Sequence, residues 1–194
     1  IPTNADLNVS FNKENQATND GFKGGYSGFV SYDYAASTQV QSAFKTQPSL
    51  FLAKCNTWLE ATEQGWMFYS YRNDAKAVFE FIQNLIQQPH STPQFQLNTP
   101  CTARWNQATY KQAFQQVQDY IVAGDCYQIN LTQEFKANAN GKLLATANAF
   151  WQLTNAPYAG YARVGEFELL SCSPELFIEF LEHRKMLTKP IKGT

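Results

Sequence analysis

Three parts of the chain carry apolar side chains at helical spacing, and each part predicts a helix. The first follows Asp74, a residue type that favours the N-cap, and covers positions 77–86. The second is an apolar stripe that stops before Gly124, and a glycine is typical of the position after a helix. The third covers residues 142–153. The members of the second stripe are Tyr110, Phe114, Val117, Tyr120 and Ile121.

Runs of aromatic and branched apolar residues, bounded by glycine, proline or polar turns, predict short strands. Residues 60–65 supply such a polar turn in the first half of the chain. Strands that follow one another in meanders, interrupted by single helices, indicate an α+β fold with a mostly antiparallel sheet flanked by helices. The predicted strands are residues 24–32, 49–59, 66–71, 125–135, 158–163, 166–172, 176–180 and 185–188.

Residues 87–100 contain several prolines and no apolar periodicity, so they predict a connection between two parts of the chain. We therefore expect an N-terminal lobe over residues 1–88 and a connection over residues 89–108. A second region is expected over residues 109–194. The beginning of the N-terminal lobe is polar and weakly patterned, which predicts an irregular lead-in.

The composition indicates a folded protein without a charge bias toward nucleic acid or membranes. Hydrophobic residues make up 44% of the 194 residues and aromatic residues 15%, which is enough for the core of one domain or most of one. The formal net charge of −1 provides no basic surface for nucleic acid or anionic lipid. Apolar runs are also shorter than a membrane span requires. The net charge is compatible with a small neutral or anionic metabolite as the ligand.

Four cysteines, Cys55, Cys101, Cys126 and Cys172, lie far apart along the chain. They form no CxxC pair and no cluster with histidine at metal-ligand spacing, so no metal ligand is predicted within the chain. Cys126 and Cys172 fall in predicted strands, which favours buried free thiols over disulfides. Free thiols are typical of a reducing compartment, and we expect a cytoplasmic protein.

The hexapeptide Lys-Pro-Ile-Lys-Gly-Thr at residues 189–194 contains a candidate amine nucleophile, Lys192. Pro190 restricts the backbone before this lysine, and Gly193 permits a turn or the close approach of a ligand after it. A lysine amine becomes nucleophilic only where burial or a neighbouring cation lowers its pKa. From the spacing alone, Lys192 fits an exposed basic residue in a loop more simply.

Glu175 is a candidate general acid or base, because it follows Pro174 at the entrance to an apolar strand. The spacing alone also fits a solvated glutamate at a strand end. A hairpin formed by residues 176–180 and 185–188 would, however, bring Glu175 and Lys192 toward the same end. This expected geometry makes the two residues a candidate pair.

Several motifs spread over roughly the last 170 residues carry a family resemblance. They are residues 25–33, residues 110–135 with the core Ala-Gly-Asp-Cys-Tyr-Gln-Ile-Asn-Leu, Asn-Ala-Pro-Tyr at 155–158, Ser-Cys-Ser-Pro-Glu-Leu-Phe at 171–177, and residues 189–194. With these motifs the chain resembles the chorismate-utilising enzymes, the family of anthranilate synthase component I and aminodeoxychorismate synthase component I. The resemblance implies that residues 109–194 begin the chorismate-binding region and that the α+β fold is that of this family.

The resemblance also implies roles for individual residues. Lys192 would attack the chorismate ring as the hydroxyl leaves, and ammonia would then displace the lysine to give 4-amino-4-deoxychorismate, the precursor of 4-aminobenzoate and folate. Glu175 would protonate the departing hydroxyl and later help the incoming amine to lose a proton. Gly193 and Thr194 would contact the substrate. The family segment that matches Pro157 and Tyr158 helps to form a tryptophan pocket.

A lysine at position 192 is similar to the aminodeoxychorismate synthase branch, since anthranilate synthases usually carry alanine there. The resemblance implies a further C-terminal half that is absent from this chain and holds the Mg²⁺-binding glutamates and a glycine-rich substrate site. Strands of the two halves interleave in the family, so sheet edges and apolar faces are expected to be exposed here.

By the same resemblance, the partners are chorismate and a glutamine amidotransferase subunit that supplies ammonia. The 194 residues alone are expected to show negligible turnover. An anthranilate synthase component I-like enzyme and a non-catalytic regulatory or interaction module stay open as alternatives.

Overall fold

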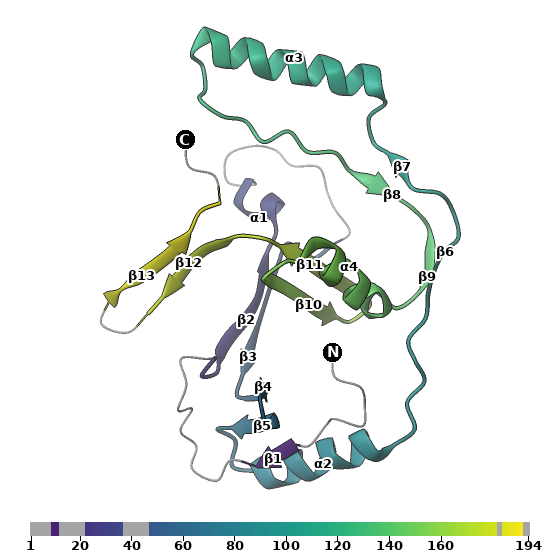
Figure 1. Ribbon diagram of the computed structural model, residues 1–194, viewed down its shortest axis with the longest axis vertical. Helices are drawn as coiled ribbons and strands as arrows, with labels where there is room; N and C mark the ends of the chain where they lie inside the picture. Colours follow the sequence, from purple (N-terminus) through teal and green to yellow (C-terminus); the bar gives the residue numbers. More distant parts are fainter. Residues whose placement is uncertain (1–8, 12–21, 37–46, 182–183, 192–194) are drawn as a thin grey trace. The chain divides into compact units, whose positions relative to one another are not determined.

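The structure is a computed structural model, and it describes a large part of the chain (Figure 1). The described residues are 9–11, 22–36, 47–181 and 184–191. Their contacts form two compact units. Unit 1 takes Ile1–Thr92 together with Ala147–Thr194, and unit 2 takes Pro93–Thr146. The last part of the chain thus groups with the first part, whereas the sequence analysis assigned it to the second region.

Unit 1 contains most of the described strands, and they pair mainly as antiparallel ladders. A parallel pair between β1 and β5 is the exception among them. The α+β fold with mostly antiparallel strands is therefore confirmed. Along the chain, the elements of unit 1 are β1 (Val9–Phe11), β2 (Gly25–Val30), α1 (Tyr32–Ala36), β3 (Leu50–Cys55), β4 (Thr57–Thr62), β5 (Gly65–Ser70), α2 (Ala75–Gln87), α4 (Ala147–Thr154), β10 (Tyr158–Val164), β11 (Phe167–Ser173), β12 (Leu176–Phe180) and β13 (Met186–Lys189).

The core of unit 1 lies on β5, the central strand of the sheet β1-β5-β4. Its last three residues, Phe68, Tyr69 and Ser70, are buried, and Phe68 is fully inaccessible to solvent. The Phe68 ring packs against helix α2, since its centroid is 5.4 Å from that of Phe79 on this helix. Helix α2 therefore covers the sheet through its apolar stripe.

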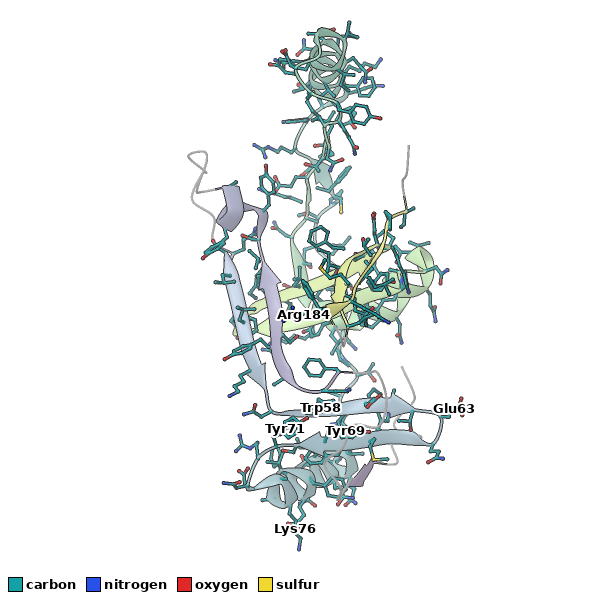
Figure 2. The ribbon with its side chains drawn as sticks, turned by 90° about the vertical axis from the view of Figure 1, so that its left-hand side faces the viewer. Trp58, Glu63, Tyr69, Tyr71, Lys76 and Arg184 are labelled. Carbon is teal, nitrogen blue, oxygen red and sulfur yellow. The ribbon has the colours of Figure 1, made fainter. Side chains whose placement is uncertain are left out.

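An aromatic cluster fixes the register of the β4–β5 hairpin (Figure 2). Trp58 lies directly opposite Tyr69, and the two rings stack with centroids 5.2 Å apart and planes 12° apart. Tyr71 approaches the same indole at 5.4 Å, and its hydroxyl donates a hydrogen bond to the carbonyl of Lys23. Aromatic pairs across strands stabilise one register over its neighbours, so this cluster also holds the segment that leads into β2.

The ribbon β2–β3 requires a glycine at position 28, where the two backbones approach closely. A methyl group on Gly28 would overlap the backbone carbonyl of Phe51. We expect Gly28→Ala to lower the free energy of unfolding by about 1–3 kcal/mol, as overpacking does elsewhere. Urea unfolding of the intact protein, followed by circular dichroism, measures this change.

Gly160→Ala is the matched control for this substitution. Gly160 also lies within a strand, but a Cβ atom there would meet nothing within 4 Å. Because glycine weakens a strand interior by roughly 0.5–1 kcal/mol relative to alanine, this variant should be neutral or slightly more stable. Equal destabilisation by both substitutions would contradict the close approach at Gly28.

Helix α4 packs on β11 in the second half of unit 1. The indole Nε1 of Trp151 donates a hydrogen bond of 3.1 Å to the backbone carbonyl of Ser171. In addition, Ala147 at the start of the helix is fully buried. Strands β10 and β11 pair without interruption from Tyr158 opposite Ser173 to Val164 opposite Phe167. The strands expected over residues 158–188 are all present, within one or two residues of their expected ends.

Unit 2 consists of one long helix and two short ladders. Strand β6 pairs with β9, and β7 pairs with β8, both antiparallel. None of the described residues of unit 2 is buried. Its elements are β6 (Phe95–Leu97), β7 (Thr102–Ala103), α3 (Gln107–Ala123), β8 (Phe135–Lys136), β9 (Ala139–Gly141) and the 3₁₀ helix η2 (Leu143–Thr146).

Both ends of α3 are capped, and the sequence analysis predicted the cap at the C-terminal end. The side chain of Asn106 accepts a hydrogen bond of 2.9 Å from the backbone N–H of Thr109. At the other end Gly124 adopts the left-handed conformation, with φ of 81°, and its N–H reaches the carbonyl of Ile121. A residue with a Cβ atom would be strained in that conformation, so the expected C-terminal glycine is confirmed.

Asn106→Ala is expected to lower the stability of α3 by about 1 kcal/mol, because the first-turn N–H loses its acceptor. Hydrogen exchange of the Thr109 amide should be faster in the variant. Asn106→Asp keeps an acceptor oxygen and should retain the wild-type exchange rate. Unchanged protection in the alanine variant would show that solvent caps this helix equally well.

One expected strand is not formed. Residues 125–135 do not form a strand; among them only Phe135 is in a ladder, at the start of β8. In this segment Gln133 hydrogen-bonds through its side chain to both the N–H and the carbonyl of Trp105. The predicted N-cap position of Asp74 is confirmed, since α2 begins at the next residue. Its carboxylate makes no capping bond, however, and instead accepts two hydrogen bonds of 2.7 Å from Arg72. That interaction lowers the pKa of Asp74.

A smaller difference concerns the helix expected over residues 142–153. It begins as the 3₁₀ helix η2 and becomes α-helical only at Ala147. The exposed apolar faces implied by the resemblance are present, for example Phe177 on β12, 85% exposed, and Val122 on α3, 87% exposed. Apolar area left in water is unfavourable, so these faces contribute little to the stability of the fold.

Candidate active site and family

Glu175 lies in the turn between β11 and β12. Neither the β10–β11 ladder nor the β12–β13 ladder includes it. The last pair of the first ladder is Ser173 with Tyr158, and the first pair of the next is Leu176 with Lys189. The hydroxyl of Ser173 donates a hydrogen bond of 3.2 Å to the backbone carbonyl of Glu175. This bond spans the intervening proline and closes the turn.

The antiparallel hairpin of β12 and β13 returns the chain to Glu175. The ladder pairs Leu176 with Lys189, so the residues after Lys189 continue past the glutamate. There the backbone N–H of Ile191 donates a hydrogen bond of 3.4 Å to Oε1 of Glu175. The expected hairpin is confirmed as far as Ile191.

Three of the candidate site residues, Lys192, Gly193 and Thr194, lie outside the described residues. The position of the Lys192 amine relative to the carboxylate therefore stays a prediction. What the structure does place beside Glu175 is the backbone of Ile191, the residue that directly precedes Lys192.

A cavity of about 520 Å³ lies in unit 1 between the ribbon β2–β3 and the ribbon β10–β11. Phe29 and Phe167 join the two ribbons, with ring centroids 5.6 Å apart. The apolar part of the wall includes Phe29, Phe51 and Leu169, and Arg163 adds a cation. Such a concave, mostly apolar site with a few polar groups is typical of small-molecule binding.

Pro157 and Tyr158, the candidate tryptophan-pocket residues, lie at the start of the strand that forms one wall of this cavity. Tyr158 is the first residue of β10, and residues 160–163 of the same strand line the cavity. The two candidate residues are themselves outside the lining. Their part in a tryptophan pocket stays a prediction.

Three polar residues lie close together on the ribbon β10–β11: Tyr161 and Arg163 on β10, and Glu168 on β11. The guanidinium Nε of Arg163 lies 3.9 Å from Oε1 of Glu168, and Glu168 keeps only 11% of its side chain exposed. Desolvation raises the pKa of Tyr161, and the nearby Glu168 carboxylate raises it further. The Tyr161 phenol therefore stays neutral at physiological pH, and its hydrogen bond to the Glu168 carboxylate favours this neutral form.

Within the described part of the chain, histidine, cysteine, aspartate and glutamate do not gather in any group of three or more that could hold a metal ion. All four cysteines are free thiols, as expected, but Cys126 and Cys172 are half-buried and not buried as predicted. The described helices also lack the length and hydropathy that crossing a membrane would require.

Two features of the site were missed by the sequence analysis. One is the hydroxyl of Ser173, although its position in Ser-Pro-Glu could have suggested a side chain that closes a proline turn. The other is the cavity between the two ribbons, which depends on tertiary packing and leaves no signal in local sequence.

Comparison with known proteins identifies the family. The family model described as chorismate binding enzyme matches residues 3–194. Aminodeoxychorismate synthase component 1 of Salmonella typhimurium is 34% identical over 122 residues, 63% of this chain and 26% of that protein. The protein of the same name from Klebsiella aerogenes is 37% identical over 100 residues, 52% of this chain and 22% of that protein.

A protein from Synechocystis named anthranilate synthase component I-like protein is 28% identical over an alignment of 215 residues, which covers 100% of this chain and 40% of that protein. The chain therefore spans about a quarter of the length of the first relatives and less than half of this one. Since the family model covers nearly every residue, the chain belongs to the chorismate binding enzyme family.

Proposed function

We propose that the chain is part of an aminodeoxychorismate synthase component I, which converts chorismate and ammonia to 4-amino-4-deoxychorismate. The observation that carries this proposal is the hydrogen bond from the Ile191 N–H to the Glu175 carboxylate. It brings a proton-transfer group to the segment that contains Lys192, the candidate nucleophile. The names of the bacterial relatives support the same reaction.

In the first step, the neutral amine of Lys192 forms a C–N bond to the chorismate ring as the C–O bond of the ring hydroxyl breaks. Glu175, in its protonated form, gives its proton to the departing hydroxyl, which leaves as water. The products of this step are a cationic lysine adduct and the Glu175 carboxylate. Gly193 and Thr194 contact the substrate during this step.

In the second step, ammonia forms a new C–N bond to the ring as the bond to Lys192 breaks, so the lysine amine leaves with its electron pair. The product ammonium then gives one proton to the Glu175 carboxylate. This transfer restores both residues, and the balance over the two steps is chorismate and ammonia to aminodeoxychorismate and water.

Mg²⁺ belongs to the proposed full-length enzyme, in which its ligands are expected outside these 194 residues. The described residues do not fit a magnesium site, because they contain no cluster of acidic groups of the required kind.

The proposed partner is a glutamine amidotransferase subunit that supplies the ammonia, in keeping with the words "component 1" in the names of the relatives. The proposed compartment is the cytoplasm, and the proposed pathway is folate biosynthesis. The free thiols of the four cysteines support a reducing compartment.

The test is an assay of the intact protein, meaning the proposed full-length enzyme that contains these 194 residues, with chorismate, Mg²⁺ and ammonium salt. Products are separated and identified by mass spectrometry. We expect 4-amino-4-deoxychorismate, and the intact protein should also carry a transient adduct with the mass of chorismate less one water. Conversion to any other product, or recovery of unchanged chorismate, would refute the proposal.

Anthranilate synthesis is the second candidate, and the Synechocystis relative that matches over the whole chain favours it. Fluorescent anthranilate in the same assay would decide for this reaction. A non-catalytic regulatory or interaction module is the third candidate, and it predicts that no product forms although the protein is folded.

A further inference from the structure

The backbone around Glu175 is fixed by neither of the neighbouring ladders. Strand β11 ends its pairing at Ser173, and the β12–β13 ladder starts at Leu176. Pro174 has no N–H and therefore cannot donate a hydrogen bond to a ladder. The ladder of β12 is also irregular between Leu176 and Glu179. The orientation of Glu175 must therefore come from other interactions.

Two hydrogen bonds hold Glu175, one at each end of the residue. The Ser173 hydroxyl donates to its backbone carbonyl at 3.2 Å, and the Ile191 N–H donates to its carboxylate at 3.4 Å. Both bonds are at the long end of the usual range, and both are accessible to water. Because neither is strong alone, loss of one should weaken the other.

We infer that Ser173 is a positioning residue for the Glu175 carboxylate. Its hydroxyl fixes the peptide plane that follows Glu175, and this restrains the backbone from which the glutamate side chain leaves. From this backbone the carboxylate meets the N–H of Ile191. The consequence for catalysis rests on the proposed function, in which Glu175 transfers a proton to and from the substrate.

A general acid must lie within hydrogen-bond reach of the group that it protonates. Without the Ser173 hydroxyl, the carboxylate would spend less time in that position. Since one hydrogen bond of this kind is lost, kcat should fall by about three- to tenfold. KM should stay near its wild-type value, because substrate binding does not require the proton transfer.

The kinetic test compares Ser173→Ala with Ser173→Thr in the intact protein supplied with ammonium salt. The threonine variant keeps the hydroxyl and should restore most of kcat. Thr188→Val is the matched control, because it removes a hydroxyl from an exposed position on β13 in the same hairpin. A merely structural role would lower the amount of folded protein, which by itself lowers the apparent kcat at unchanged KM. Rates are therefore divided by the amount of folded protein, measured by circular dichroism, and a merely structural role would then leave kcat at its wild-type value.

The backbone amide of Ile191 gives a readout that does not need activity. In protein labelled with ¹⁵N-isoleucine, Glu175→Ala defines the chemical shift of this amide without its acceptor. The Ile191 signal of Ser173→Ala should move toward that position, and the signals of Ser173→Thr and Thr188→Val should not.

A wild-type Ile191 signal and wild-type kcat in Ser173→Ala would overturn the inference. If the wild-type protein converted no chorismate but the Ile191 signal moved as expected, the proposed function would fail and the positioning role of Ser173 would stand.

Discussion

Replacing Lys192 by alanine is expected to lower kcat for aminodeoxychorismate formation by a factor on the order of 10⁴ or more, the scale on which covalent enzymes lose rate without their nucleophile. The adduct with the mass of chorismate less one water should disappear from the protein at the same time. Steady-state rates and intact-protein mass spectra measure the two effects.

Two further variants make this result specific to the nucleophile. Lys192→Arg keeps the positive charge but cannot supply a neutral amine, so it should be as inactive as the alanine variant. Lys189→Ala removes an exposed lysine from β13 in the same segment and should leave the rate close to wild type. An active arginine variant would mean that position 192 acts through its charge and that no lysine adduct forms.

Glu175→Gln is expected to lower kcat by about 10²–10⁴-fold, the usual contribution of a general acid or base. Glutamine keeps an acceptor oxygen for the Ile191 N–H, so the turn between β11 and β12 should be retained. It cannot give a proton to the departing hydroxyl. The rate loss should therefore appear without a loss of stability, and thermal unfolding of the same sample checks this.

Glu179→Gln is the matched control for Glu175→Gln. Glu179 is an exposed glutamate on β12, in the same hairpin but within its ladder. Its replacement changes the net charge by the same amount and should leave kcat unchanged. If both variants lost activity equally, the effect would come from the charge of the hairpin, and Glu175 would not be the proton-transfer group.

The strands on both sides of Glu175 could be predicted from sequence because each is a short apolar run between strong turn signals. Pro174 separates β11 from β12, and the polar residues before Met186 separate β12 from β13. Gly124 gave an equally strong signal, since its position after an apolar stripe requires a left-handed backbone. These features depend on residues close together in the chain.

Features that depend on distant residues could not be predicted in the same way. The segment 125–135 has a composition suited to a strand, but strand formation depends on a neighbouring strand, and only Phe135 of this segment is in a ladder with another described strand. Asp74 precedes α2 as predicted, but its carboxylate hydrogen-bonds to the nearby Arg72, a choice between two local partners that the sequence leaves open. The cavity likewise requires two ribbons far apart in sequence to lie side by side.

The distribution of tryptophan between the two units has a consequence for spectroscopy. Trp58, Trp66 and Trp151 belong to unit 1, and Trp58 stacks on Tyr69 there. Trp105 is the only tryptophan in residues 93–146, and the side chain of Gln133 holds its backbone. In a variant with the other three tryptophans replaced by phenylalanine, the fluorescence of Trp105 would report the unfolding of unit 2 separately from that of unit 1. The fold thus provides an intrinsic optical label for each unit.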